Sequence, residues 1–172
     1  MDASHNLLVV SDLHLSEGRD PVTGLIHPNE DFFQDVPFAQ FLAHHAALSR
    51  NPDATYYYQK PWRLVVNGDI FDFLQVASLP AEGDELLAVT GKQRYSDLRP
   101  NERLYGLGTE EKAIVWKLEK IAAGHPLFFQ AMAWFAAQPE YELILMKGNH
   151  DVEMYWSVVQ KRLLALLEQA YA

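Results

Sequence analysis

The sequence contains no cysteine and few basic residues. Without cysteine, a disulfide framework and a thiolate zinc site are both excluded. The 172 residues include 14 Lys and Arg against 23 Asp and Glu, which gives a net charge of -9. Nonspecific binding to a nucleic acid backbone needs clustered cations, so this composition argues against it. A phosphorylated small molecule stays compatible with this charge, because bound metal cations would reverse the local field.

Two further absences concern membranes and secretion. No apolar run approaches the length that crosses a membrane. The stretch 1–6 lacks the basic start of a secretory signal, and the apolar run 7–10 is too short for its central region. We therefore expect a cytoplasmic protein. With 49% hydrophobic residues, the chain is predicted to fold as a single domain over 1–172.

Three short apolar runs each lead into a polar turn. They cover 7–10, 64–66 and 143–146, and their length predicts buried strands, the second of which spans 62–67. The segments between them are long enough to contain helices, which favours parallel pairing. The predicted fold class is therefore α/β.

Helical periodicity or capping signals mark five segments, at 31–48, 72–79, 109–123, 125–138 and 152–170. Thr109 is the expected N-cap of the third. The segment 125–138 is apolar almost all round, so it is either buried in the core or part of a contact surface. We predict a loop over 11–29, an aromatic approach to the second strand at 56–58 and an irregular stretch over 91–108.

Side chains that can bind metal follow all three predicted strands. They are Asp12, His14, Asp69, Asp72, Asn149 and His150. Ligands bind at the carboxyl ends of parallel strands, so we expect one shared site. Hard oxygen donors with an imidazole suit Mn²⁺, Mg²⁺, Fe²⁺ or Zn²⁺. Two such cations about 4 Å apart need a bridging ligand such as a carboxylate, and a hydroxide between them can attack a phosphate ester. Taken singly, Asp and Asn at these junctions are also ordinary turn residues.

The same residues belong to three motifs in a fixed order. These are Asp12-Leu13-His14, then Gly68-Asp69-Ile70-Phe71-Asp72, then Gly148-Asn149-His150-Asp151. Together they resemble the motifs of calcineurin-like metallophosphoesterases. One motif alone is a weak signal, whereas three in order after apolar strands are a strong one. The resemblance implies the N-terminal portion of a metallophosphoesterase-type βαβ sandwich, with a mainly helical insertion over 80–140 between the second and third motifs.

The resemblance also implies how metals are bound. Asp12 and His14 would bind the first divalent ion, Asp69 would bridge both ions, and Asn149 would bind the second. Mn²⁺ is the first choice, with Fe, Zn or Mg as alternatives. His125 and the remaining histidines outside the motifs are interpreted as structural.

The resemblance also implies that residues of the third motif would carry out catalysis. His150 and Asn149 would contact the substrate, and His150 would protonate the leaving group. Asp72 would orient His150, since a carboxylate partner fixes the tautomer of an imidazole and raises its basicity. The implied activity is dimetal-dependent hydrolysis of a phosphomonoester, a phosphodiester or a diphosphate bond, in a phosphorylated small molecule or a nucleotide-type substrate. The branch that cleaves nucleotide-sugar lipids typically has Arg in place of His150. A protein phosphatase is a second option.

The chain departs from the family pattern after the third motif. Family members have a further histidine and then a G-H-x-H pair, whereas no histidine follows His150 here. We therefore expect the N-terminal half of a larger enzyme, with a weakly held second metal and impaired turnover. Uncovered sheet faces would favour a homo-oligomer. The alternative function is a non-catalytic scaffold that uses its apolar helices to bind a protein partner.

Overall fold

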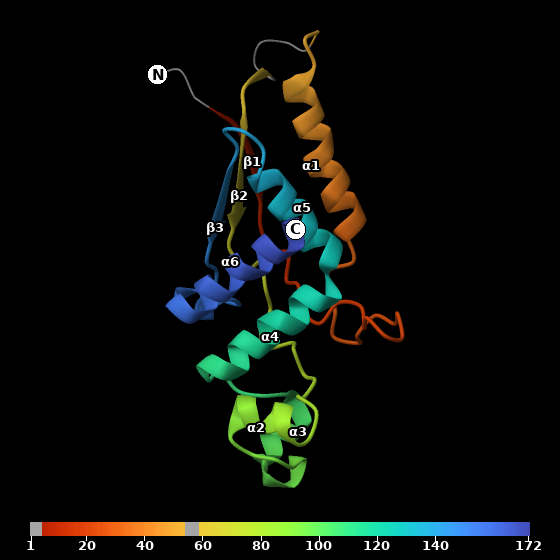
Figure 1. Cartoon of the computed structure of the whole chain (residues 1–172), viewed down its shortest axis with the longest axis vertical. Coiled ribbons are helices and arrows are strands. Elements are labelled where there is room, and N and C mark those ends of the chain that lie inside the picture. The colour runs from red at the N-terminus through yellow and green to blue at the C-terminus, as the bar shows by residue number, and fades with distance from the viewer. Residues whose placement is uncertain (1–4, 54–58) are drawn as a thin grey trace.

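A three-stranded parallel sheet forms one layer of the protein (Figure 1). The structure is a computed structural model, and it describes residues 5–53 and 59–172. The strands are β1 (Asn6–Val10), β2 (Trp62–Asn67) and β3 (Glu142–Met146), in the order β1-β2-β3. The predicted α/β class and the parallel pairing are confirmed. The predicted aromatic approach at 56–58 lies outside the described residues.

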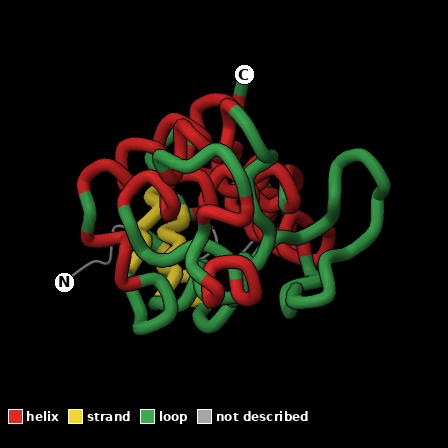
Figure 2. Tube along the Cα trace, turned by 90° about the horizontal axis from the view of Figure 1, so that it is seen from below, coloured by secondary structure: helices red, strands yellow, loops and turns green. Residues whose placement is uncertain are grey.

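Helices fill the connections and follow the last strand. They are α1 (Asp35–Arg50), α2 (Asp84–Thr90), α3 (Pro100–Tyr105), α4 (Glu111–Gly124), α5 (Pro126–Ala136) and α6 (Ser157–Tyr171), with 3-10 turns at Tyr95–Asp97 and Val152–Tyr155. Pro37 lies in the first turn of α1, where a proline is tolerated. The loop predicted over 11–29 is confirmed, and it projects from the body in two perpendicular views (Figures 1 and 2).

Several helix predictions were wrong in detail. No helix forms over 72–79, because the Asp72 side chain accepts the N–H groups of Leu74 and Gln75 and closes a turn instead. The stretch 91–108 is not irregular throughout: Pro100 opens the short helix α3, a position that suits proline.

Two helix starts also differ from the prediction. Glu110, rather than Thr109, is the residue before α4. The segment predicted as one helix over 152–170 begins as a 3-10 turn and breaks at Trp156, whose backbone is extended. Such shifts of a residue or two at a helix end are common, but the break at Trp156 is a real interruption.

Within residues 5–53 and 59–172, helices cover one face of the sheet and leave the other exposed. On the covered face Leu8, Leu64 and Val66 are buried beneath α1 and α5. On the other face Leu7 and Val9 of β1, and Ile144 and Met146 of β3, are exposed. The prediction that β3 is a buried strand was therefore wrong, since sheets of this parallel type are buried only when helices cover both faces.

Helix α5 is the centre of the core. Its side chains Phe128, Phe129, Met132 and Phe135 are buried, and the helix packs against both α1 and α6. Of the two readings of this apolar segment, burial in the core is confirmed. No helix in the described ranges combines the length and apolar character needed to span a membrane.

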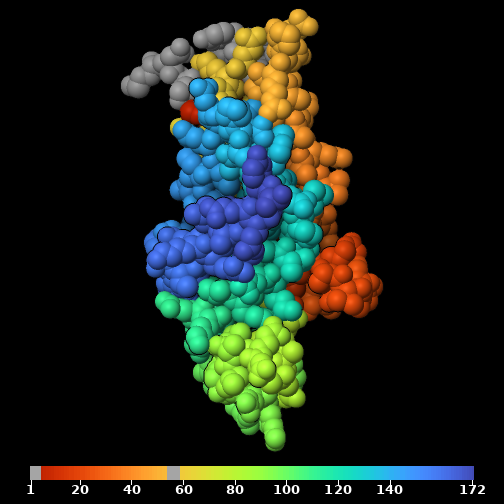
Figure 3. Space-filling view, viewed as in Figure 1, coloured from red at the N-terminus to blue at the C-terminus, as the bar shows by residue number. Residues whose placement is uncertain are grey.

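The predicted insertion, 80–140, is divided between two clusters of apolar side chains. Helices α4 and α5 contribute to the main core with the sheet, α1 and α6. Helices α2 and α3 lie around a small separate cluster that includes Leu86 and Leu98, and they form the protrusion at one end of the molecule (Figure 3). Most of the helical segment therefore belongs to the same folding unit as the sheet.

Candidate metal centre

The loops after β1 and β2 run side by side beyond the sheet. Backbone N–H groups of Leu13 and His14 donate to the carbonyl oxygen of Asp69 at 2.9 and 3.0 Å. The N–H of Leu15 donates to the carbonyl of Ile70 at 3.0 Å. This backbone ladder places the first and second motifs next to each other.

The loop after β3 joins them at Asp69. The backbone N–H of His150 donates to Asp69 Oδ1 at 2.9 Å. Gly148 lies so close that a Cβ added to it would stand 2.0 Å from Asp69 Oδ1. Only glycine fits there, because any side chain would displace the carboxylate. The convergence of the three predicted motifs is therefore confirmed.

The backbone at this junction is strained. Asp12, His14 and Asp69 have φ angles of 54°, 52° and 51°, in the left-handed region that non-glycine residues rarely adopt. Within the described residues, Glu140 is the other non-glycine residue with a positive φ. Left-handed residues of this kind cost about 1 kcal/mol or more each, and they persist at functional sites where the surroundings impose them. Asp12, His14 and Asp69 are three of the four residues expected to bind metal.

The donor atoms of these residues are close enough to share one cation. One ligand atom each from Asp12, His14 and Asp69 lies within 4.8 Å of the other two. Two carboxylates and an imidazole are a donor set that Mn²⁺ accepts, so the residues present fit a divalent ion. Asn149 is exposed between Gly148 and His150, on the loop that contacts Asp69.

His150 and Asp72 form the expected pair. His150 Nδ1 lies 2.9 Å from Asp72 Oδ2, and Asp72 Oδ1 accepts the N–H groups of Leu74 and Gln75. A carboxylate only accepts hydrogen bonds, so Nδ1 of His150 carries a hydrogen and Nε2 remains for a ligand. The backbone N–H groups therefore fix Asp72 through Oδ1, and Asp72 orients the imidazole of His150 through Oδ2.

Two residues near the site were given no role by the sequence. Asp151 is fully buried, and its carboxylate accepts the N–H of Gly148 at 2.6 Å and that of Ile70 at 2.8 Å, which locks the third loop onto the second. Its place in the third motif could have indicated this. Lys117 of α4 is also buried, and Nζ donates to the carbonyl of Phe73 at 2.8 Å. Burial lowers the pKa of Lys117. No sequence pattern marked it.

A second histidine–carboxylate cluster is sealed inside the protein. His125 lies between Glu30, 3.0 Å from Nε2, and Asp35, 3.1 Å from Nδ1. Burial alone would lower the pKa of His125, but the hydrogen bonds with Asp35 and Glu30 outweigh it and raise the pKa to about 9. Glu30 also accepts the N–H groups of Ser16 and Gly18, so the cluster anchors the start of the long loop. This agrees with a structural role for His125.

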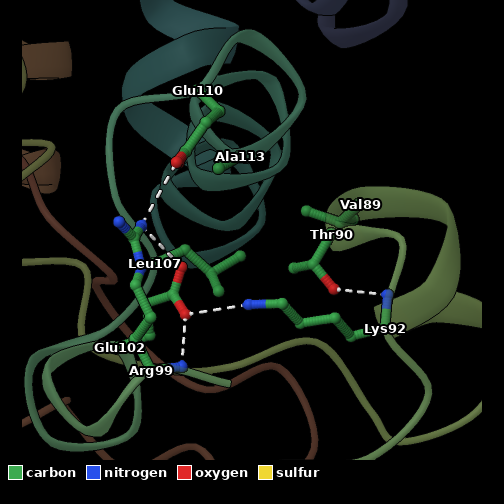
Figure 4. Close-up of a pocket in the computed structure, with 8 residues that line it drawn as sticks. All are labelled: Val89, Thr90, Lys92, Arg99, Glu102, Leu107, Glu110 and Ala113. Atoms are coloured by element: carbon green, nitrogen blue, oxygen red, sulfur yellow. Dashed lines mark hydrogen bonds and ion pairs between the residues drawn. The ribbon is translucent and has the colours of Figure 1, made fainter. Parts of the chain in front are cut away.

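A pocket lies between α2, α3 and α4, and Figure 4 shows the residues that line it. Glu102 is held there by Arg99 at 2.8 Å and by Lys92 at 3.3 Å. The hydrogen bond from Arg99 lowers the pKa of Glu102 to about 2. None of the predicted site residues lines this pocket. Its charges neutralise one another, so it is a poor candidate for the chemistry.

Comparison with protein-family models, with curated proteins and with solved structures found no match for this chain. The class of site is therefore defined by its own residues: a candidate metal centre at the carboxyl edge of a parallel sheet. Its function is inferred from that chemistry.

Proposed function

We propose that this chain hydrolyses phosphate esters with the help of two divalent metal ions, with Mn²⁺ as the first choice. The observation that carries the proposal is the convergence of three strand-end motifs on Asp69, with left-handed backbone at Asp12, His14 and Asp69. Left-handed backbone of this kind clusters at functional sites, and here it falls on three metal-capable residues. The resemblance of the motifs to those of calcineurin-like metallophosphoesterases supports the same reaction.

Four residues would hold the ions. Asp12, His14 and Asp69 supply a set of donors within 4.8 Å of one another, and Asn149 would add an amide oxygen from the third loop. Bound divalent ions supply Lewis acidity toward phosphoryl oxygens and a water of lowered pKa near neutral pH. Asp69 is suited to the bridging position, because its loop contacts both of the others.

His150 would act on the substrate. Its side chain is 38% exposed, so a ligand can reach it. Asp72 holds Nδ1, which directs Nε2 toward the ligand, where it can hydrogen-bond a phosphoryl oxygen and give a proton to the leaving oxygen. Asp151 and Lys117 would position the loops that carry these groups.

The open position of the site bears on substrate class. Asp12 and Asn149 are exposed, and His14 and His150 are partly exposed. A solvent-exposed site of this kind admits a phosphodiester or a nucleotide-type substrate, in which groups are attached on both sides of the phosphorus. We therefore favour phosphodiester or diphosphate bonds over a small enclosed phosphomonoester.

Hydrolysis of bis-p-nitrophenyl phosphate with added Mn²⁺ tests the proposal. We expect Mn²⁺-dependent release of nitrophenolate, and a loss of roughly 10²- to 10⁴-fold in His150→Ala, the range for removal of a general acid. His44→Ala is the matched control, because His44 is an exposed histidine of α1 outside the site. An unchanged rate in His150→Ala would remove the catalytic role.

The exposed apolar sheet face favours one other function. Leu7, Val9, Ile144 and Met146 form an uncovered surface that suits a non-catalytic scaffold. The same assay separates the two functions. Mn²⁺ binding without any hydrolysis would support the scaffold, whereas Mn²⁺-dependent hydrolysis would support the enzyme.

A further inference from the structure

The histidine and acidic side chains of the site form two overlapping donor sets. One is Asp12, His14 and Asp69, and the other is His14, Asp72 and His150. The first has two carboxylates and one imidazole, and the second has one carboxylate and two imidazoles. Nitrogen-rich sets suit Zn²⁺ and Co²⁺, whereas oxygen-rich sets suit Mn²⁺ and Mg²⁺. We propose that His14, Asp72 and His150 form a separate Zn²⁺ site whose occupation inhibits hydrolysis. The inhibitory effect rests on the proposed function.

The distances between the donors suit a tetrahedral ion. Asp72 Oδ2 lies 2.9 Å from His150 Nδ1 and 3.7 Å from His14 Nδ1. Zinc binds nitrogen and oxygen at about 2.0–2.2 Å, so neighbouring donors of a tetrahedral zinc are about 3.3–3.6 Å apart. The two observed distances bracket that value. Small rotations of two partly exposed imidazoles are enough to equalise them.

The surrounding structure favours Zn²⁺ binding by His14, Asp72 and His150. The rings of His14 and His150 are nearly perpendicular, with centroids 4.6 Å apart, and both turn Nδ1 toward the same oxygen of Asp72. Oδ1 of Asp72 is already occupied by the N–H groups of Leu74 and Gln75, which fixes the carboxylate with Oδ2 facing the two imidazoles. Outer hydrogen bonds of this kind orient metal ligands. Because both imidazoles are partly exposed, a water molecule can reach the fourth coordination position of the ion.

Occupation of this set would interfere with the reaction in two ways. A neutral imidazole offers one lone pair, so His14 cannot serve an ion in each set at once. Zn²⁺ bound to His14 therefore removes a donor from the Mn²⁺ set. Zn²⁺ bound to Nδ1 of His150 also replaces the hydrogen through which Asp72 orients this residue. Zinc binds such sites more tightly than manganese, so inhibition is expected even with Mn²⁺ in excess.

Metal binding to the full chain tests the proposal without relying on activity. Co²⁺, the spectroscopic substitute for Zn²⁺, is titrated while the visible absorption of a tetrahedral site is followed. Mn²⁺ is titrated by electron paramagnetic resonance. His150→Gln should weaken Co²⁺ binding at least about tenfold and leave Mn²⁺ binding within about twofold. Asp12→Asn should give the reverse pattern. Circular dichroism checks that each variant is folded.

Four outcomes would be decisive. An unchanged Co²⁺ affinity and spectrum in folded His150→Gln would overturn the site. Equal weakening of Co²⁺ and Mn²⁺ in Asp12→Asn would also overturn it, because the two ions would then share one position. Hydrolysis that Zn²⁺ does not inhibit would remove the inhibitory effect. The Co²⁺ pattern without any hydrolysis would instead overturn the proposed function and leave the site in place.

Discussion

Two clusters in this protein use the same residue types in opposite settings. His125 with Glu30 is sealed, with side chains 2% and 1% exposed. His150 also pairs with a buried carboxylate, Asp72, but its own side chain is 38% exposed. In the first cluster both ring nitrogens face carboxylates, whereas in the second Nδ1 alone hydrogen-bonds a partner among the described residues.

The difference separates a structural histidine from one proposed to be functional. A sealed imidazole with two carboxylates is protonated and holds segments together. An exposed imidazole with one carboxylate keeps its second nitrogen for a ligand, and its loop contacts Asp69, a metal-capable residue with left-handed backbone. Residue type alone does not distinguish the two, but burial and the state of the second nitrogen do.

The largest effect is expected from breaking the sealed cluster. His125→Leu leaves the buried Glu30 without its cationic partner, and loss of one member of a buried ion pair costs about 3–5 kcal/mol. The matched variant His150→Leu, at the exposed cluster, should cost less than about 1 kcal/mol. Urea unfolding measures both. Equal losses in the two variants would contradict the distinction.

The sealed cluster should also make stability depend on pH. The pKa of His125 is raised from 6.5 to about 9 in the folded protein, so its contribution is complete below pH 6.5 and is lost as pH rises through about 9. At 1.36 kcal/mol per pKa unit the contribution is roughly 3 kcal/mol. We expect the free energy of unfolding to fall between pH 6.5 and 9.5 in the native chain. The slope should flatten in His125→Leu, and an identical slope would contradict this assignment.

A smaller effect is expected at the exposed cluster, on metal binding. Gly148→Ala would place a Cβ 2.0 Å from Asp69 Oδ1, so the carboxylate must move. Mn²⁺ affinity should fall at least about tenfold, as it does when groups that orient metal ligands are changed. Gly24→Ala is the control, because no atom lies within 4 Å of its added Cβ. Equal Mn²⁺ affinity in both variants, by calorimetry, would exclude Asp69 as a ligand.

The smallest effect is a gain in stability at the proposed metal site. Asp12 has a φ of 54° and an exposed side chain, and glycine adopts this backbone without strain. Asp12→Gly should raise the free energy of unfolding by about 0.5 kcal/mol and lose Mn²⁺ binding. Thermal unfolding without metal checks the gain. A clear loss of stability would show that Asp12 serves the fold rather than the ligand.

The sequence predicted the strands and the convergence of their ends well, because short apolar runs followed by Asp, His and Asn are typical of parallel strands that end at a shared site. It did not predict that Ile144 and Met146 would be exposed, since burial depends on which helices cover the sheet. It also missed the helix at Pro100, which is too short to show a period. The pairing of His125 with Glu30 joins residues far apart in the chain, and no local pattern reveals such a contact.

The central claim is that Asp12, His14 and Asp69 hold a divalent ion. The most direct measurement is a crystal structure grown with Mn²⁺, with anomalous scattering recorded at the manganese edge. We predict an anomalous peak bonded to oxygen atoms of Asp12 and Asp69 and to a ring nitrogen of His14, at about 2.1–2.3 Å. Absence of a peak there, in crystals that bind Mn²⁺ elsewhere or not at all, would contradict the claim.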